Sequence, residues 1–218
     1  SPKYSTPRRF KKDPLIPPYP AHTLVDHLTD GPAHYIKINK FMLQPGHVVL
    51  SSDDPNAIQG SQLNDADFAI MARMLAAFKG KGITYYNGGV LSGCSQLHKH
   101  AQYIPVDRTP LMRAYKEKVR MPYKYFAKEL EGYGSSEIKR AYRELLNKAF
   151  HNHEGQYNFI VADMVALLVP RSKPIHPSGF SVNSLNFAGH FPVFNQFSKE
   201  LLKSPLLSLR EVGIPSDA

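Results

Sequence analysis

A glycine- and serine-rich loop that runs directly into a strand-like segment is the feature that most constrains this chain. The loop begins at Asn87, and the segment after it, 97–106, has the composition of a β-strand. Because alternate side chains of a strand point to the same face, His98, His100 and Gln102 should share one face. We therefore expect the loop and three hydrogen-bonding side chains to meet at one site.

Apolar side chains elsewhere in the chain predict an antiparallel sheet. Residues 34–39 and 47–51 alternate between apolar and polar side chains, and 44–46 reads Gln-Pro-Gly, a turn signal between them. Further strands are expected at 83–86, 157–162 and 165–170. A strand hairpin followed by separate strands and helices favours the α+β class, with an antiparallel sheet and flanking helices.

Capping residues and helical spacing predict the helices. Asn64 can cap the first helix, which should end at Gly80. Its buried side chains should be Phe68, Met71, Leu75 and Phe78. Ser135 or Ser136 should cap a second helix that buries Ile138, Tyr142, Leu145 and Leu146. A late element near 180–183 and a C-terminal helix over 201–212 complete the pattern.

The chain divides into an arm and one domain. Residues 1–20 are rich in proline and show no apolar period, so we expect an extended arm there. Residues 21–218 should form a single domain, because 218 residues with 42% hydrophobic content suffice for one core. Segment 107–134 is polar and basic without a clean period, and we expect an inserted excursion there, for which the pattern indicates neither helix nor strand.

Net charge and cysteine content bound the partners and the compartment. A formal charge of +9 favours an anionic ligand, since a field of one sign attracts the opposite sign. The single cysteine, Cys94, forms no internal disulfide, which agrees with a reducing compartment. Apolar runs are too short to span a membrane, and the N-terminus lacks a signal peptide's apolar segment. We expect a soluble protein of the cytoplasm, with the nucleus as a second compartment.

The loop and the histidines predict chemistry on a phosphate. Backbone N–H groups of such a loop form a concave anion site, and small side chains let a phosphate approach them closely. An imidazole can attack phosphorus and form a covalent intermediate. Zinc is the alternative for His98 and His100, but two ligands fall short of the three that a catalytic zinc normally needs. We therefore predict no metal site.

The same motif resembles the active site of a known enzyme family. Residues 87–89 (Asn-Gly-Gly), 92–96 (Ser-Gly-Cys-Ser-Gln) and 98–102 (His-Lys-His-Ala-Gln) are similar to the motif of the diadenosine tetraphosphate phosphorylases, also called ATP adenylyltransferases. That family belongs to the histidine triad superfamily, near its galactose-1-phosphate uridylyltransferase branch. Further similar segments follow in family order at 38–41, 45–48, 169–172, 182–185, 188–189 and 212–215. The resemblance implies a histidine-triad-like antiparallel sheet.

The resemblance also implies a role for each matching residue. His100 would be the nucleophile that accepts AMP, Gln102 would hydrogen-bond the transferring phosphate, and His98 would support them. The phosphate loop would be lined by Ser92, Gly93, Cys94, Ser95 and Gln96. The other nucleotide contacts would be Asn39, Lys40, Asn87, Asn183, Ser184 and Leu185.

The partners implied by the resemblance are small molecules, with membranes excluded and nucleic acid disfavoured. His100 would attack the α-phosphorus of diadenosine tetraphosphate, ATP would leave, and inorganic phosphate would then take AMP to give ADP. The reverse reaction is the ATP adenylyltransferase activity. No dedicated cofactor is implied, although a divalent cation such as Mg²⁺ can accompany the polyphosphate.

Gln102 favours one reaction type over another. Triad hydrolases typically carry a third histidine at this position, whereas a glutamine amide does not titrate near neutral pH. A water nucleophile benefits from a general base, while inorganic phosphate is already an anionic nucleophile. Phosphorolysis is therefore favoured, and a dinucleoside polyphosphate hydrolase is the alternative. A basic nucleic-acid-binding module is the second alternative, with no interleaved aromatic and basic motif to support it.

The chain departs from the fungal members of the family at two ends. The fungal enzymes use a lysine in their N-terminal region, and the candidates for its counterpart in this chain are Lys11 and Lys12. His190 and Phe194 stand where those enzymes carry a methionine and a lysine. These departures bear on how the far phosphates are held, and so on the preferred length of the polyphosphate.

Overall fold

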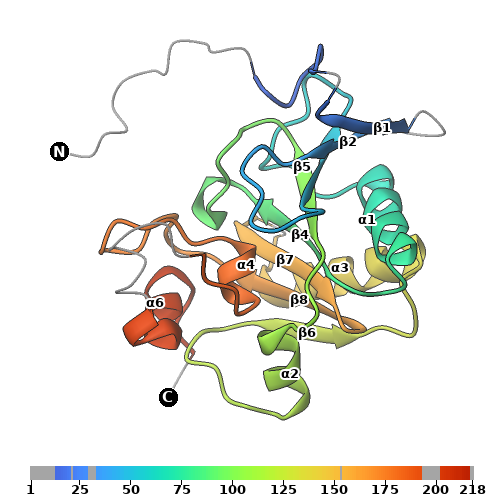
Figure 1. The fold of residues 1–218 in the computed structure, drawn as a ribbon. Coiled ribbons are helices and arrows are strands. Elements are labelled where there is room, and N and C mark those ends of the chain that lie inside the picture. Colours follow the sequence, from blue (N-terminus) through green and yellow to red (C-terminus); the bar gives the residue numbers. More distant parts are fainter. Residues whose placement is uncertain (1–12, 21, 29–32, 153, 193–201, 217–218) are drawn as a thin grey trace.

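An antiparallel sheet of eight strands organises the computed structural model (Figure 1). The structure describes residues 13–20, 22–28, 33–152, 154–192 and 202–216. Within them the strand order is β1-β2-β3-β5-β4-β7-β8-β6, and neighbouring strands run antiparallel. The strands are β1 (Leu24–Leu28), β2 (His34–Ile38), β3 (Val48–Ser52), β4 (Ile83–Gly88), β5 (His100–Ile104), β6 (Phe126–Glu129), β7 (Tyr157–Ala162) and β8 (Val165–Pro170). The predicted α+β class and antiparallel sheet are confirmed.

Helices flank both faces of this sheet. One face is covered by α1 (Asp65–Ala77) and α3 (Ser135–Ala149). The other is covered by α2 (Pro110–Lys116), α4 (Ser184–Phe187) and α6 (Pro205–Val212). The predicted cap at Asn64 is confirmed, because its side chain accepts the N–H groups of Ala66 and Asp67. The predicted serine cap of α3 is wrong: Ser135 is already helical, and the N-cap is Gly134, which has no side chain to accept a hydrogen bond. Among the described residues, no helix is long and apolar enough to cross a membrane.

Alternating side chains give the sheet two different faces. On β5, Ala101 and Tyr103 join the core beneath α1 and α3. His100 and Gln102 take the alternate positions and therefore point to the second face. Tyr85 on β4 belongs to that second face, whose helices pack over β4, β7 and β8. The two motif residues thus lie beside the region that these helices cover.

The motif strand is shorter than predicted. It begins at His100 instead of residue 97 and ends at Ile104 instead of residue 106. His98 forms only an isolated bridge with Ile58, because the backbone there pairs with the loop before α1: the Lys99 N–H donates to Ala57 O. The prediction that three motif side chains share one strand is therefore wrong for His98 and right for the other two.

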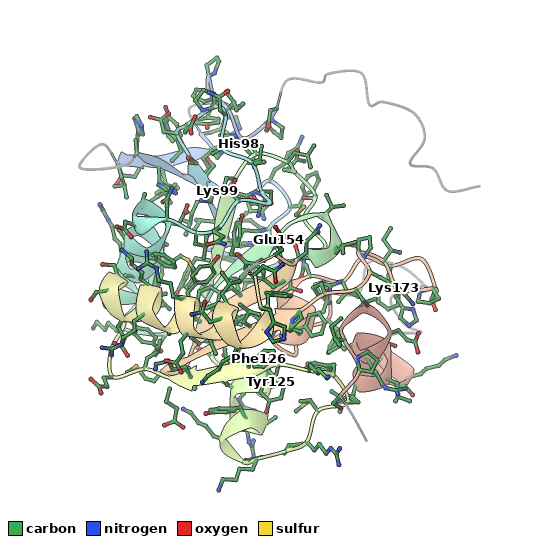
Figure 2. All side chains as sticks on the ribbon, turned by 180° about the vertical axis from the view of Figure 1, so that it is seen from behind. His98, Lys99, Tyr125, Phe126, Glu154 and Lys173 are labelled. Carbon is green, nitrogen blue, oxygen red and sulfur yellow. The ribbon has the colours of Figure 1, made fainter. Side chains whose placement is uncertain are left out.

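Segment 107–134 holds regular structure that its composition did not predict. It contains α2 and β6, and β6 pairs with β8 at an edge of the sheet. Seen from behind in Figure 2, Tyr125 and Phe126 mark this edge, whereas His98 and Lys99 lie toward the opposite end, near α1. A four-residue edge strand has too few alternations to be detected, and β1 was not predicted either.

Two helix predictions are corrected. Phe78 is the C-terminal cap of α1 and is 41% exposed, with its ring stacked on Tyr103 at 4.7 Å between centroids. The helix stops before Gly80 as predicted, and Gly80 has a φ of 76°, which glycine adopts readily. α6 begins at Pro205, and residue 201 lies outside the described residues. The element near 180–183 is a bridge from Ser181 to Ile175, just before α4.

The described part of the predicted N-terminal arm packs on β2. Leu15 is buried, and the Tyr19 ring meets Tyr35 edge-on at 4.9 Å between centroids. Tyr35 lies on the same sheet face as His100, since Tyr35 pairs with Ser51 and Ser51 pairs with His100. Residues 13–20 therefore cover the outer part of the second face. Residues 1–12 lie outside the described residues.

Candidate active site

The carbonyl oxygen of His98 holds the ring of His100 in one tautomer. Its Nδ1 atom lies 2.8 Å from the carbonyl oxygen of His98, and only a protonated nitrogen can donate there. Nε2 is therefore left with a free lone pair. Burial lowers the pKa of His100 to about 4, and the side chain is 5% exposed. At neutral pH the ring is thus uncharged, with Nε2 as its nucleophilic atom.

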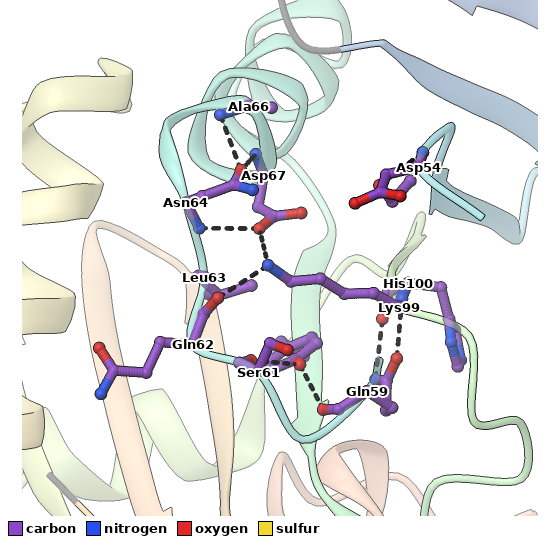
Figure 3. Close-up of polar contacts among 12 residues, drawn as sticks. Asp54, Gln59, Ser61, Gln62, Leu63, Asn64, Ala66, Asp67, Lys99 and His100 are labelled. Atoms are coloured by element: carbon purple, nitrogen blue, oxygen red, sulfur yellow. Dashed lines mark hydrogen bonds and ion pairs between the residues drawn. The ribbon is translucent and has the colours of Figure 1, made fainter. Parts of the chain in front are cut away.

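Gln59 holds the backbone of His100 in place (Figure 3). Its Oε1 accepts the His100 N–H at 2.7 Å, and its Nε2 donates to the carbonyl oxygens of His100 and Asn87 at 3.0 and 2.9 Å. One buried amide therefore ties the start of β5 to the end of β4. Sequence reasoning missed Gln59, because a single glutamine in a polar segment carries no periodic signal.

Gln102 is surrounded by donors on the same sheet face. The Tyr85 hydroxyl donates to Gln102 Oε1 at 2.9 Å, and Asn39 Nδ2 donates to it at 3.3 Å. His47 Nε2 lies 2.9 Å from the same oxygen. Tyr85 and His47 were not predicted. His47 precedes Val49 and Ser51 at alternate positions, which is the signal that could have placed it on this face.

The neighbours of Gln102 fix which end of its amide faces them. Asn39 Oδ1 accepts the N–H of Phe41 at 2.9 Å, so the amino group of Asn39 faces Gln102. His47 Nδ1 accepts the N–H of Leu43 at 3.4 Å, so the proton of the neutral ring sits on Nε2. Both neighbours therefore donate, and Gln102 must turn its oxygen toward them. Its amino group is left as a donor for a ligand.

His98 and Lys99 support the nucleophile from either side. His98 Nε2 donates to the Ser52 carbonyl oxygen at 2.7 Å, which ties it to β3. Lys99 points to the opposite face, where Nζ lies 2.6 Å from Asp67 Oδ2 and 2.7 Å from the carbonyl oxygen of Gln62 (Figure 3). Both side chains are about 4% exposed. The backbone around His100 is thus anchored on both sides of the sheet.

The glycine-rich loop turns tightly against α4. A short 3₁₀ turn, Val90–Ser92, follows β4, and the Ser92 hydroxyl donates to the Gly89 carbonyl oxygen. Gly93 has a φ of 79°, and a Cβ atom there would lie 2.0 Å from the Val182 carbonyl oxygen. Only glycine fits this contact, so the loop is held against the residue pair that precedes α4.

A buried polar network joins the loop to α4. Asn87 Oδ1 accepts hydrogen bonds from Asn158 Nδ2, Ser184 Oγ and Ser184 N at 2.8, 2.7 and 3.0 Å. Arg171 Nη1 donates to Asn158 Oδ1 at 2.6 Å. The structure thus brings two predicted nucleotide contacts, Asn87 and Ser184, into direct contact, and Asn158 and Arg171, which were not predicted, extend the network. With its oxygen saturated, Asn87 has its amino group free to face a ligand.

The other residues predicted to contact the nucleotide differ in burial and in their hydrogen-bond partners. Asn183 caps α4 by accepting the N–H of Leu185 at 2.9 Å, and Leu185 is buried, so both have structural roles here. Lys40 is exposed and, with Asn39, lines a cavity of about 330 Å³ at the end of β2. Ser95 is exposed, and Gln96 and Cys94 are half-buried. Burial raises the pKa of the Cys94 thiol.

Of the positions that depart from the family motif, His190 lies within the described residues. His190 Nε2 lies 3.0 Å from the carbonyl oxygen of Arg108, which places it beside the start of α2. Phe194, Lys11 and Lys12 lie outside the described residues.

Comparison with known proteins identifies the fold. Three crystal structures of yeast Ap4A phosphorylase Apa2, where Ap4A is diadenosine tetraphosphate, match the chain. The Ap4A complex matches with a TM-score of 0.81 and 21% identity, over 96% of this chain and 83% of that one. The structure without a named ligand gives 0.80 and 22%, over 95% and 83%. The AMP complex gives 0.76 and 23%, over 88% and 77%.

Family models cover the chain from end to end. The model of the Ap4A phosphorylase N-terminal domain matches residues 3–122, more than half of the chain. The model of the ATP adenylyltransferase C-terminal domain matches residues 119–215. A comparison with curated protein sequences gave no match. The fold and the family models define a nucleotidyltransferase class of enzyme. The chain belongs to the Ap4A phosphorylase and ATP adenylyltransferase family, which confirms the resemblance of the 87–102 motif.

Proposed function

We propose that the chain catalyses the reversible phosphorolysis of Ap4A to ATP and ADP through a covalent AMP–histidine intermediate. His100 Nε2 attacks the α-phosphorus of Ap4A, the bond from that phosphorus to the bridging oxygen breaks, and ATP leaves. An oxygen of inorganic phosphate then attacks the same phosphorus, the P–N bond breaks, and ADP leaves. The observation that carries the proposal is the setting of His100: burial keeps its ring neutral, and the Nδ1 contact with His98 O places the single proton on Nδ1, so Nε2 is unprotonated.

The orientation of Gln102 supports a role at the transferring phosphate. Its amino group is turned away from Tyr85, Asn39 and His47, so it is a donor for a phosphate oxygen. Donors placed where charge develops lower the barrier of phosphoryl-type transfer. The Asn87 amino group and the N–H groups of the glycine-rich loop supply further donors at the same place.

The same amide favours phosphate over water as the second nucleophile. Gln102 does not titrate, and burial lowers the pKa of His47, so neither group is a strong base within reach of the phosphate. Water would benefit from such a base, whereas phosphate is already an anion. The relatives crystallised with Ap4A and with AMP agree with this choice of nucleotides. We propose these nucleotides and phosphate as the ligands of this chain.

Incubation with Ap4A, with and without inorganic phosphate, tests the proposal. ATP and ADP should form only when phosphate is present. The result that contradicts the proposal is formation of AMP and ATP at a rate independent of phosphate, which is the outcome expected of a dinucleoside polyphosphate hydrolase. Repeating the assay with and without Mg²⁺ tests our expectation that a divalent cation arrives with the polyphosphate.

We further propose a location in the cytoplasm or nucleus. The single cysteine, Cys94, lies in the half-buried loop and is a free thiol. A free thiol is kept reduced in those compartments. Fluorescence microscopy of the tagged protein tests this, and a signal confined to a secretory compartment would contradict it.

A further inference from the structure

A lysine outside the contacts of His100 and Gln102 points to the same sheet face as the nucleophile. Lys37 on β2 pairs with Val49 on β3, and Val49 pairs with Gln102 on β5. Because directly paired residues point to the same face, Lys37 and Gln102 lie on one face, two strands apart. Strands lie ~4.8 Å apart, so the two Cα atoms are about 10 Å from each other, within reach of a lysine side chain and a bound phosphate chain.

Lys37 is buried with few partners. It is 4% exposed, Nζ lies 4.0 Å above the Tyr19 ring, and its hydrogen bond to Pro14 O is 3.5 Å long. Among the described residues, no carboxylate lies within 4.0 Å of this ammonium group. Burial lowers its pKa to about 8, although Asp13 opposes the shift. An ammonium group with three donors is thus left with one long hydrogen bond.

Ser51, a second buried donor, lies on β3, between the strands that carry Lys37 and the nucleophile. Ser51 on β3 pairs with His100, and its hydroxyl is fully buried without a hydrogen-bond partner among the described residues. The Tyr19 hydroxyl lies near enough to Ser51 to interact with it electrostatically, but it donates to Leu15 O at 2.5 Å and forms no hydrogen bond of normal geometry with Ser51. Buried hydroxyls nearly always have a partner, so an orphan beside a nucleophile needs an explanation.

The electrostatic field of Lys37 reaches His100. Burial is the main cause of the lowered His100 pKa, and the positive charge of Lys37 adds to it. The Lys37 ammonium and the Ser51 hydroxyl are both donors and lie on the His100 side of the sheet, so together they suit a ligand that is an anion with several acceptor oxygens. Among the described residues, no carboxylate of this chain lies close enough to the Lys37 ammonium to act as that anion.

We infer that Lys37 and Ser51 form a phosphate subsite beside His100, which holds a phosphate of the leaving ATP beyond the one that His100 attacks. This inference rests on the proposed function. On binding, the Lys37 ammonium exchanges its contacts with the Tyr19 ring and Pro14 for phosphate oxygens, and the Ser51 hydroxyl gains its missing partner. AMP, which has no phosphate beyond the transferred one, does not reach the subsite.

Equilibrium binding of ATP and AMP to Lys37→Met tests the subsite. The variant should bind ATP at least ~10-fold more weakly and AMP within about twofold of the unchanged protein, because one charge-assisted hydrogen bond is worth about a factor of ten or more. Ser51→Ala, which removes only the hydroxyl, should weaken ATP by a smaller factor and leave AMP unchanged. Lys81→Met removes the same charge at an exposed position and should leave both affinities unchanged.

The outcomes separate the subsite from the proposed function. Equal weakening of ATP and AMP in Lys37→Met, an unchanged ATP affinity, or an equal loss in Lys81→Met would each overturn the subsite. Ser51→Ala keeps the test decisive if Lys37→Met fails to fold, because an unchanged ATP affinity in Ser51→Ala also overturns it. If one of these affinity results is found while the unchanged protein shows phosphate-dependent turnover of Ap4A, the subsite fails and the proposed function stands. The proposed function fails if that turnover is absent.

Discussion

The ring of His100 donates from Nδ1 to the carbonyl oxygen of His98 over 2.8 Å. His98, two positions before the nucleophile, therefore sets the tautomer of the His100 ring. The contact is local, because both residues belong to one short segment held by Gln59 and Lys99. It leaves Nε2 as the only ring atom able to attack phosphorus. The chemistry of the site therefore depends on a backbone geometry, which other side chains maintain.

The His100 pKa predicts a loss of stability in acid. The unfolded chain has a histidine pKa near 6.5, and the folded chain about 4. As the pH falls from 6.5 toward 4, the unfolded chain binds a proton that the folded chain does not, so stability falls; below 4 this contribution levels off. Urea unfolding at pH 7 and pH 4.5 should show a loss from His100 on the order of 2 kcal/mol.

His100→Asn is the control for this pH effect. The variant should lose less stability than the unchanged protein between the two pH values, because the buried titrating ring is gone. His47 contributes with the same sign, since burial lowers its pKa too, so the difference between the two proteins is the informative quantity. An equal loss in both proteins would show that His100 is not buried in its neutral form.

Gln102→His should increase transfer of AMP to water. A histidine at this position can act as a general base, which contributes roughly 100-fold or more to such steps. The ratio of AMP released to ADP formed, measured with Ap4A at a fixed phosphate concentration, should rise at least ~10-fold. An unchanged ratio would count against the argument that the amide selects phosphate.

His47→Phe should slow turnover by loosening Gln102. The His47 ring donates to Gln102 Oε1, and without that donor the amide can rotate away from the phosphate. We expect kcat to fall about 10- to 100-fold, because a catalytic group displaced by about 1 Å can cost up to about 100-fold in rate. The affinity for AMP should change less. Tyr85→Phe removes a second donor to the same oxygen. If the two changes act through Gln102, adding His47→Phe to a Gln102→Ala protein should cost little more.

Lys99→Met should destabilise the fold. Lys99 and Asp67 are 4% and 2% exposed and form an ion pair of 2.6 Å (Figure 3), and Asp67 also lies 3.0 Å from His34. Removing one partner of a buried pair leaves an uncompensated charge, which costs about 3–5 kcal/mol. Urea unfolding measures this loss. Adding Asp67→Asn should restore part of it, whereas no recovery would show that the pair is not coupled.

Local patterns in the sequence predicted much of the fold. Helix α1 was predicted because Asn64 caps it and its apolar residues repeat, and strands β7 and β8 because they are buried on both faces. β6 was missed because four residues show no periodicity, and its place at the sheet edge depends on β8, some forty positions away. Phe78 follows the helical period but lies where the helix has already ended.

The sequence predicted the site residues that lie within the continuous motif, and it missed several that come from other strands and loops. His100 and Gln102 lie on one strand, and their shared face follows from alternation. Gln59, His47, Tyr85 and Asn158 come from other elements and meet the motif through the sheet register. Such contacts over dozens of residues leave no local pattern, so they emerge only when the strands are paired.

Detection of the AMP–protein adduct tests the central claim most directly. The protein is incubated with Ap4A labelled in its adenosine part, without phosphate, quenched, and analysed by mass spectrometry and acid treatment. The unchanged protein should carry one AMP in an acid-labile bond at His100 and release it as ADP when phosphate is added. His100→Gly should form no adduct and lose turnover. An adduct and retained turnover in His100→Gly would contradict the assignment of His100 as the nucleophile.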